Sequence, residues 1–378
     1  MLRWFLLCFA LALAALGLFT VFKAPAWSSW KLALLAGEFG HWLAIVAVLI
    51  GIAAGWLAGD TPTIARVTLA IALGAALLLA KPAWQAWRQG PELAEQLAAQ
   101  FGGAQPVPPP FSLATLFFGP AVTPVAVQSL TAPNALPLDF YRAVGRIDTP
   151  APCVVMVHGG GWDSGDRTQL PGLNHWLARR GYAVAAISYR LAPRFQWPAQ
   201  QHDLIAAIAW LKERAGELGI DPQRFVVIGR SAGGQIALVT AYTAGDPAIR
   251  GVIGLYAPSD LIFGYVNTVE DDMLKSPALM RQFLGGTPDS ARANYESASA
   301  LFHVTPRTPP TLLIHGVNDA LVWYRHSVRL DARLAEQRIP RVYVSFPWAT
   351  HAIEFNLNGP GGQLTTYAIE AFLAGVTK

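Results

Sequence analysis

Charged residues are scarce in this 378-residue sequence. Only 14% are Asp, Glu, Lys or Arg, whereas 53% are hydrophobic, and an ordinary soluble domain has about 25% charged residues. The net charge is +4 and no run of Lys or Arg occurs. This composition excludes a nucleic-acid-binding surface as the main function. The apolar excess lies in roughly the first 80 residues, so this segment differs in kind from the rest.

Cysteine is almost absent as well. The two cysteines, Cys8 and Cys153, both lie in apolar stretches. Two such distant residues form neither a disulfide framework nor a zinc-binding spacing. We expect both to be buried as small hydrophobic side chains, and we expect no metal and no cofactor.

Three long apolar runs cover residues 2–22, 42–58 and 64–80. Each is close to the length that a bilayer span requires. A cleaved signal peptide is the alternative for the first run, because residues 24–26 (Ala-Pro-Ala) resemble a cleavage site. Two further runs follow it, and tryptophans cluster near the ends of the runs, which favours three transmembrane helices and a bilayer as partner.

The positions of the basic residues predict the orientation. The two odd-numbered connections carry four basic residues and the other side carries two: Lys23, Lys31, Lys81 and Arg88 against Arg3 and Arg66. This difference predicts a cytoplasmic C-terminal part. The chain divides into a transmembrane region (residues 1–90), a short helix with a Pro-rich linker (91–120) and a soluble domain (121–378).

The third region alternates short apolar runs with helical patterns. This alternation predicts an α/β fold with a mostly parallel sheet covered on both faces. Functional groups in such sheets gather at the carboxyl ends of the strands. Residues 261–300 interrupt the alternation with a run rich in aromatic residues, Leu and Met, which predicts a small cap over the site.

The motif Gly-x-Ser-x-Gly occupies residues 229–233 and places Ser231 between an apolar run and a helical pattern. A strand, this pentapeptide and a helix are the context of a nucleophile elbow. A glycine-rich turn without catalytic function is the alternative. Residues 158–162 (His-Gly-Gly-Gly-Trp) follow another predicted strand, and their backbone N–H groups with that of Ala232 are suited to bind an oxyanion.

A nucleophilic serine needs a base and a carboxylate that orients the base. His351 lies after the last predicted strand, and Asp319 lies after the strand before it. The chain order Ser, Asp, His is that of α/β-hydrolases. Glu354 is the alternative acid, although it is close in sequence to His351.

Residues 136–378 resemble the α/β-hydrolase esterases of the hormone-sensitive-lipase and BD-FAE-like type. The matching motifs lie at residues 138–142, 158–162, 188–193, 219–222, 229–234 and 315–319 and in the loop around His351. The resemblance implies an α/β-hydrolase fold with Ser231 as nucleophile, His351 as base and Asp319 as orienting acid. It also implies Gly160, Gly161 and Ala232 as oxyanion donors.

Two features depart from this family pattern. Arg230 precedes the serine where an acidic or small residue is common, so it either favours an anionic substrate or pairs with a local carboxylate. The apolar N-terminal region is reminiscent of membrane-bound prenylcysteine methylesterases.

We therefore expect a membrane-anchored serine carboxylesterase whose substrate is a small-molecule or lipid ester. The alternatives are an esterase for lipid-modified or membrane-resident substrates, and a catalytically silent binding module.

Overall fold

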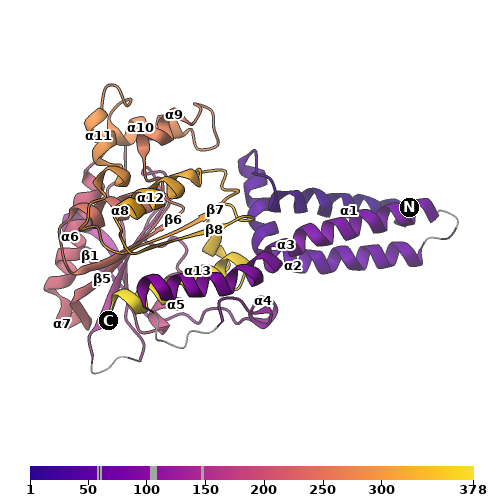
Figure 1. Ribbon diagram of the computed structural model, residues 1–378, viewed down its shortest axis with the longest axis horizontal. Helices are drawn as coiled ribbons and strands as arrows, with labels where there is room; N and C mark the ends of the chain where they lie inside the picture. The colour runs from indigo at the N-terminus through magenta and orange to yellow at the C-terminus, as the bar shows by residue number, and fades with distance from the viewer. Residues whose placement is uncertain (58, 60–61, 103–108, 146–148) are drawn as a thin grey trace.

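The computed structural model describes residues 1–57, 59, 62–102, 109–145 and 149–378 (Figure 1). Two parts are visible, a rod of three long helices and a part built around a sheet. The chain begins at the far end of the rod and ends on the sheet-containing part (Figure 1). This arrangement agrees with the prediction of apolar helices in the first part of the chain and a sheet in the rest.

The rod contains α1 (Leu2–Gly17, extended by η1 at Leu18–Thr20), α2 (Trp27–Trp56) and the first half of α3 (Pro62–Phe101). All three helices are long and apolar enough to cross a membrane. The second begins well before the expected residue 42, and residue 58 lies outside the described residues. Because α3 continues through Pro91, the short helix expected from that residue is the end of α3.

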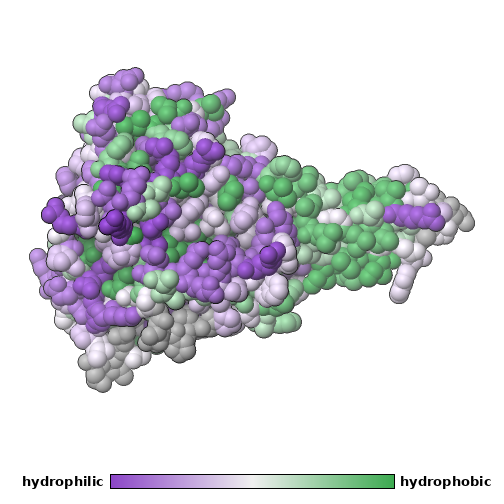
Figure 2. Space-filling model, viewed as in Figure 1, coloured by the Kyte–Doolittle hydropathy of each residue, from purple (hydrophilic) through white to green (hydrophobic). Residues whose placement is uncertain are grey.

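Large apolar side chains cover the outside of the rod (Figure 2). Leu49 and Leu77, for example, are 58% and 75% exposed. Such an apolar belt marks a surface that contacts something other than water. The expectation that Cys8 is buried is wrong: it is exposed on α1, within this belt. The helices approach one another closely at small residues, since a side chain at Gly40 of α2 would overlap the Leu79 carbonyl oxygen of α3.

The sheet has the strand order β1-β2-β4-β3-β5-β6-β7-β8. The strands are β1 (Val127–Ala132), β2 (Leu136–Tyr141), β3 (Ala151–Val157), β4 (Ala183–Ile187), β5 (Ile220–Arg230), β6 (Ile249–Leu255), β7 (Thr311–Gly316) and β8 (Arg341–Phe346). β1 pairs antiparallel with β2, and β2 pairs antiparallel with β4. The pairings along β4-β3-β5-β6-β7-β8 are all parallel. The mostly parallel α/β-hydrolase sheet is therefore confirmed. The half-exposed edge strand β1 was not predicted.

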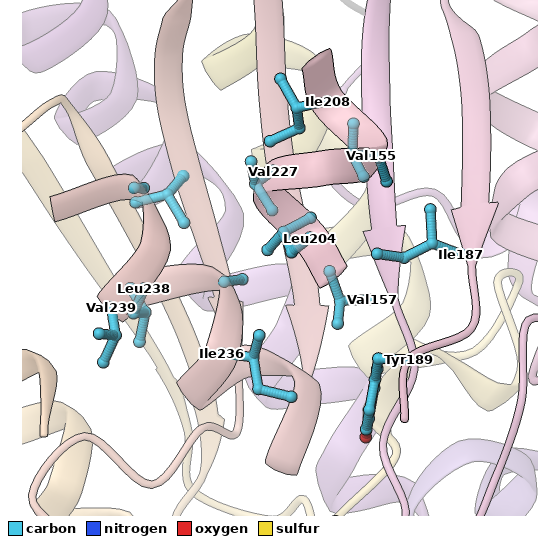
Figure 3. Packing of buried hydrophobic residues seen from close by; sticks show 14 of the residues in the cluster. Val155, Val157, Ile187, Tyr189, Leu204, Ile208, Val227, Ile236, Leu238 and Val239 are labelled. Atoms are coloured by element: carbon cyan, nitrogen blue, oxygen red, sulfur yellow. The ribbon is translucent and has the colours of Figure 1, made fainter. Parts of the chain in front are cut away.

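Helices cover both faces of the sheet. One face is covered by α6 (Ala199–Glu213), α8 (Ala232–Thr243) and α12 (Arg325–Glu336), next to the short α7 (Ala215–Leu218). The other is covered by α5 (Gly172–Arg179), α13 (Pro360–Val376) and the end of α3. Figure 3 shows Leu204 and Ile208 of α6 close to side chains of β3 and β5 such as Val155 and Val227. Both faces of the sheet are thereby buried, as a layered α/β architecture requires.

The end of α3 belongs to the core of the sheet-containing part. Leu93 and Leu97 are each 2% exposed and pack in the core beneath the sheet. Phe101 packs edge-on against Phe372 of α13, with ring centroids 4.8 Å apart. The linker expected after it includes residues 103–108, which lie outside the described residues, and α4 (Leu113–Phe118) follows. One continuous helix thus connects the rod to the sheet.

The predicted cap is a cluster of short helices at the upper edge of Figure 1. It comprises α9 (Leu261–Val266), α10 (Ser276–Leu284), α11 (Arg292–Ser297) and η3 (Ala300–His303). Its apolar side chains, such as Phe283 and Tyr295, are buried in the main core. A last short element, η4 (Ile353–Phe355), precedes α13.

The apolar rod leads to a prediction about membrane attachment. We expect the full-length protein to stay with membranes through washes with high salt and alkaline carbonate and to need detergent for release. Helices satisfy their backbone hydrogen bonds internally, as a bilayer requires, and salt weakens only charge-based attachment. Release by salt would contradict this prediction, and intact mass would reveal a cleaved N-terminal segment.

The two ends of the rod give the orientation a simple test. Lys23 lies 5.9 Å from the centroids of the Trp323 and Tyr324 rings, so the first connection is on the side of the sheet. Arg3 lies against Gly59, at the opposite end. We expect alkaline phosphatase fused after Lys378 to be inactive in a bacterial host, because the basic residues favour a cytoplasmic location. An active fusion would show that the C-terminal part lies on the opposite side of the membrane and would contradict the prediction.

Candidate active site

Ser231 lies in the tight turn between β5 and α8, with φ of 51° and ψ of −122°. A positive φ is rare for a residue with a side chain, and such strain is typical of functional turns. A side chain at Gly229 would overlap the Gly233 carbonyl oxygen, so the turn requires glycine there. The strand and helix hold Ser231 where its side chain lines a cavity. This geometry is that of the predicted nucleophile elbow.

His351 and Asp319 come together from the loops after β8 and β7. The Nδ1 atom of His351 lies 2.6 Å from Oδ2 of Asp319. The backbone N–H groups of Leu321 and Val322 donate to the other carboxylate oxygen at 2.8 and 3.0 Å. Since a carboxylate only accepts, Nδ1 of His351 carries the hydrogen, and in the neutral form of the ring Nε2 has the lone pair. His351 and Ser231 line the same cavity.

His315 is a further contact of this pair that the sequence did not identify. Its Nε2 lies 3.2 Å from Oδ2 of Asp319, and its Nδ1 lies 2.8 Å from Ser327 Oγ. Burial alone would raise the pKa of Asp319, but the charge of His351 and hydrogen bonds from His315 and His351 outweigh it. The pKa of Asp319 therefore lies well below its usual range, and this buried group stays ionised at neutral pH.

The glycine loop after β3 faces the same turn. The N–H of Gly159 donates to Gln169 Oε1 at 2.7 Å. Gly160 and Gly161 have φ of 125° and 60°, conformations that strain other residues. Within the described residues, the N–H groups of Gly160 and Gly161 have no protein acceptor. Ala232 begins α8, whose first N–H groups also lack partners within the helix.

Arg230 takes part in a buried ion pair. It is 1% exposed, and its Nε lies 2.7 Å from Oε1 of Glu354. The Tyr256 hydroxyl donates to the same oxygen at 2.7 Å. The other guanidinium nitrogens donate to the carbonyl oxygens of Gln169 and Leu170 at 3.3 Å. Of the two interpretations of Arg230, the structure therefore favours pairing with a local carboxylate.

This ion pair also supports the histidine. The ring of Tyr256 packs against the ring of His351, with centroids 4.2 Å apart. Glu354, the alternative acid, is engaged by Arg230 and Tyr256, whereas Asp319 contacts His351 directly. No sequence motif indicated Tyr256, because its contacts with Glu354 and His351 form only when separate segments pack together.

A cavity of about 990 Å³ opens over Ser231 and His351. The glycine loop forms one wall, and cap residues such as Leu279 form another. The third wall comes from the beginning of α2. Its contributing residues are Trp27, Trp30, Lys31, Leu32, Leu34, Leu35 and Phe39. A helix of the apolar rod therefore lines the cavity that holds the candidate catalytic residues.

The fold and this cavity define an α/β hydrolase with a serine at the elbow turn. A model of the BD-FAE family matches residues 138–334, slightly more than half of the chain. The chain belongs to the BD-FAE family.

Two curated relatives come from Mycobacterium tuberculosis. The probable carboxylic ester hydrolase LipM is 30% identical over 255 residues, which cover 63% of this chain and 58% of LipM. Esterase LipC is 30% identical over 252 residues, covering 64% of this chain and 62% of LipC. The match thus spans about three fifths of each relative's length.

Solved structures share the fold. A bacterial heroin esterase superposes with a TM-score of 0.60 at 23% identity and covers 70% of this chain and 89% of its own. An esterase of Pyrobaculum calidifontis has a TM-score of 0.57 at 21% identity and covers 78% of this chain and 93% of its own. Both likenesses support the α/β-hydrolase architecture.

We expect substitution of Asp319 to lower mainly the activity and substitution of Glu354 to lower mainly the stability. Asp319→Asn should lower kcat/KM by about 10³-fold or more, because the amide no longer orients and stabilises the charged imidazole. His351→Ala should cost at least as much. Glu354→Gln should mainly lower the melting temperature, since it leaves Arg230 buried without its counter-charge, at a cost of about 3–5 kcal/mol.

Ester hydrolysis and thermal melting of the purified variants test these assignments. A crippled but stable Glu354→Gln enzyme together with a mildly affected Asp319→Asn enzyme would transfer the acid role to Glu354.

Proposed function

We propose that this protein is a serine carboxylesterase anchored in a membrane by α1, α2 and the first half of α3. The observation that carries the proposal is the convergence of three side chains. The strained Ser231 shares one cavity with His351, and His351 is held at 2.6 Å by the buried Asp319. Relatives named as a carboxylic ester hydrolase and an esterase support an ester as the bond that is cleaved.

The proposed reaction has two steps. Ser231 Oγ attacks the ester carbonyl carbon while His351 Nε2 takes its proton, and the new imidazolium is stabilised by Asp319. The N–H groups of Gly160, Gly161 and Ala232 bind the oxyanion. His351 then gives the proton to the departing alkoxide, which leaves an acyl-enzyme. A water molecule, deprotonated by His351, releases the acid and restores the serine.

This chemistry uses only the protein's own groups. We propose that residues 121–378 supply the catalytic domain, residues 1–90 the anchor and residues 91–120 their connection. The alternative of a catalytically silent binding module requires that Ser231 be unreactive, and a single labelling experiment separates the two functions.

The experiment compares wild type with Ser231→Ala and with Ser290→Ala, which changes an exposed cap serine. We expect a fluorophosphonate to label wild type and Ser290→Ala but not Ser231→Ala. The last should also lose at least about 10³-fold in kcat/KM on p-nitrophenyl acetate. Alanine fits the turn, so circular dichroism should be unchanged.

A folded Ser231→Ala variant with near-normal turnover would refute this mechanism. A wild-type chain that neither reacts with the probe nor cleaves any ester would favour the silent module.

A further inference from the structure

Two cavities meet at Ser231. The larger is the cavity of about 990 Å³ that α2 borders. The smaller, of about 70 Å³, lies beneath the cap. Gly161 and Ser231 line both, so an ester carbonyl at Ser231 would direct one substituent into each cavity.

The position of His351 distinguishes the two cavities. His351 lines the larger cavity and is not part of the smaller one, whereas Ala232 lines only the smaller. A general acid must lie within hydrogen-bond reach of the atom that it protonates, which here is the oxygen of the departing alcohol. The alcohol therefore lies in the larger cavity, and the acyl group lies in the smaller.

The smaller cavity limits the acyl group. Its wall includes Leu261, Phe263, Met280 and Trp323. Met280 is 4% exposed, and Phe263 is stacked on Trp323 with ring centroids 5.5 Å apart. The smaller cavity has about 70 Å³, less than a tenth of the 990 Å³ of the larger cavity. It therefore suits a short acyl group, and the larger cavity suits the longer substituent.

The larger cavity is bordered by a helix that is long and apolar enough to span a membrane. Most of its lining side chains are apolar. Leu32 and Leu35 of α2 line it and are 46% and 39% exposed, so their apolar surface continues from the cavity to the outside of the rod. Trp27 ties the start of this helix to the cap, because its Nε1–H donates to the Met273 carbonyl oxygen at 2.7 Å.

We propose that the substrate is an amphiphilic ester of a short acyl group with a long apolar alcohol, which enters from the bilayer along α2. This inference rests on the proposed function. Ser231 Oγ forms a bond to the acyl carbon, the bond to the alcohol oxygen breaks, and His351 protonates that oxygen. The long-chain alcohol returns along α2, and water then releases a short carboxylic acid from Ser231.

Two isomeric esters separate the two ends of the substrate. Decyl acetate has a long alcohol and a short acyl group, and ethyl decanoate has the reverse arrangement. With the full-length protein in detergent micelles, we expect kcat/KM for decyl acetate to exceed that for ethyl decanoate by at least about 50-fold. Each methylene buried against an apolar wall contributes roughly fourfold, so three suffice for this difference.

Variants in the walls of the two cavities should change the preference for different ends of the substrate. Leu34 lines the larger cavity and is half-buried, so Leu34→Trp should lower the ratio of kcat/KM for decyl acetate to kcat/KM for ethyl acetate about tenfold or more. Leu49→Trp is the matched control, because Leu49 is on the same helix, 58% exposed and away from the cavity. Met280→Ala should enlarge the smaller cavity and raise the ratio of ethyl butyrate to ethyl acetate hydrolysis several-fold.

The outcomes distinguish this inference from the proposed function. Hydrolysis of ethyl decanoate at or above the rate of decyl acetate would overturn the assignment of the cavities and leave the esterase in place. Equal loss of decyl acetate and ethyl acetate hydrolysis in Leu34→Trp would overturn the path along α2. Failure of wild type to cleave ethyl acetate, with no labelling of Ser231, would overturn both proposals.

Discussion

The parallel pairing of the central strands is the constraint on which the candidate site depends. Strands β5, β7 and β8 end at the same edge of the sheet, and the loops after them carry Ser231, Asp319 and His351. These three residues are far apart in the sequence, and the sheet brings them together because their strands end at the same edge. The cavity above this edge is completed by α2, so the site lies where the sheet meets the apolar rod.

Buried polar contacts fix the helix against the sheet. Glu38 of α2 is 1% exposed and accepts hydrogen bonds from the N–H groups of Gly361 and Gly362, at 3.2 and 3.3 Å. These groups lie at the beginning of α13, where the first N–H groups have no partner within the helix and are free to donate to the Glu38 side chain. Nearby, Arg230 and Glu354 join the elbow to the loop of His351. Breaking such buried contacts is costly, which keeps α2 in register with the site.

Much of the fold could be predicted because its signals are local. Short apolar runs, helical patterns and glycine-rich turns each depend on a few neighbouring residues, and the predicted, mostly parallel sheet is confirmed. The positions of Asp319 and His351 after the last two predicted strands predict that their side chains meet, and the structure places them in contact. Their catalytic roles and that of Ser231 remain predictions.

The features that were missed depend on tertiary packing. Nothing local distinguishes a transmembrane helix that lines a cavity from one that faces only lipid, so the role of residues 27–39 was not foreseen. The contacts of Tyr256 and His315 likewise join segments that meet only after folding. Pro91 suggested a boundary, yet α3 continues through it because its apolar side packs beneath the sheet.

A covalent probe tests most directly whether the alcohol side of the active site runs along α2. A p-nitrophenyl methylphosphonate with a long alkoxy tail carrying a diazirine would react with Ser231 and release p-nitrophenolate. After irradiation, peptide mass spectrometry locates the cross-link of the tail. The account predicts cross-links within residues 27–39, and cross-links confined to the cap, or no adduct on Ser231, would contradict it.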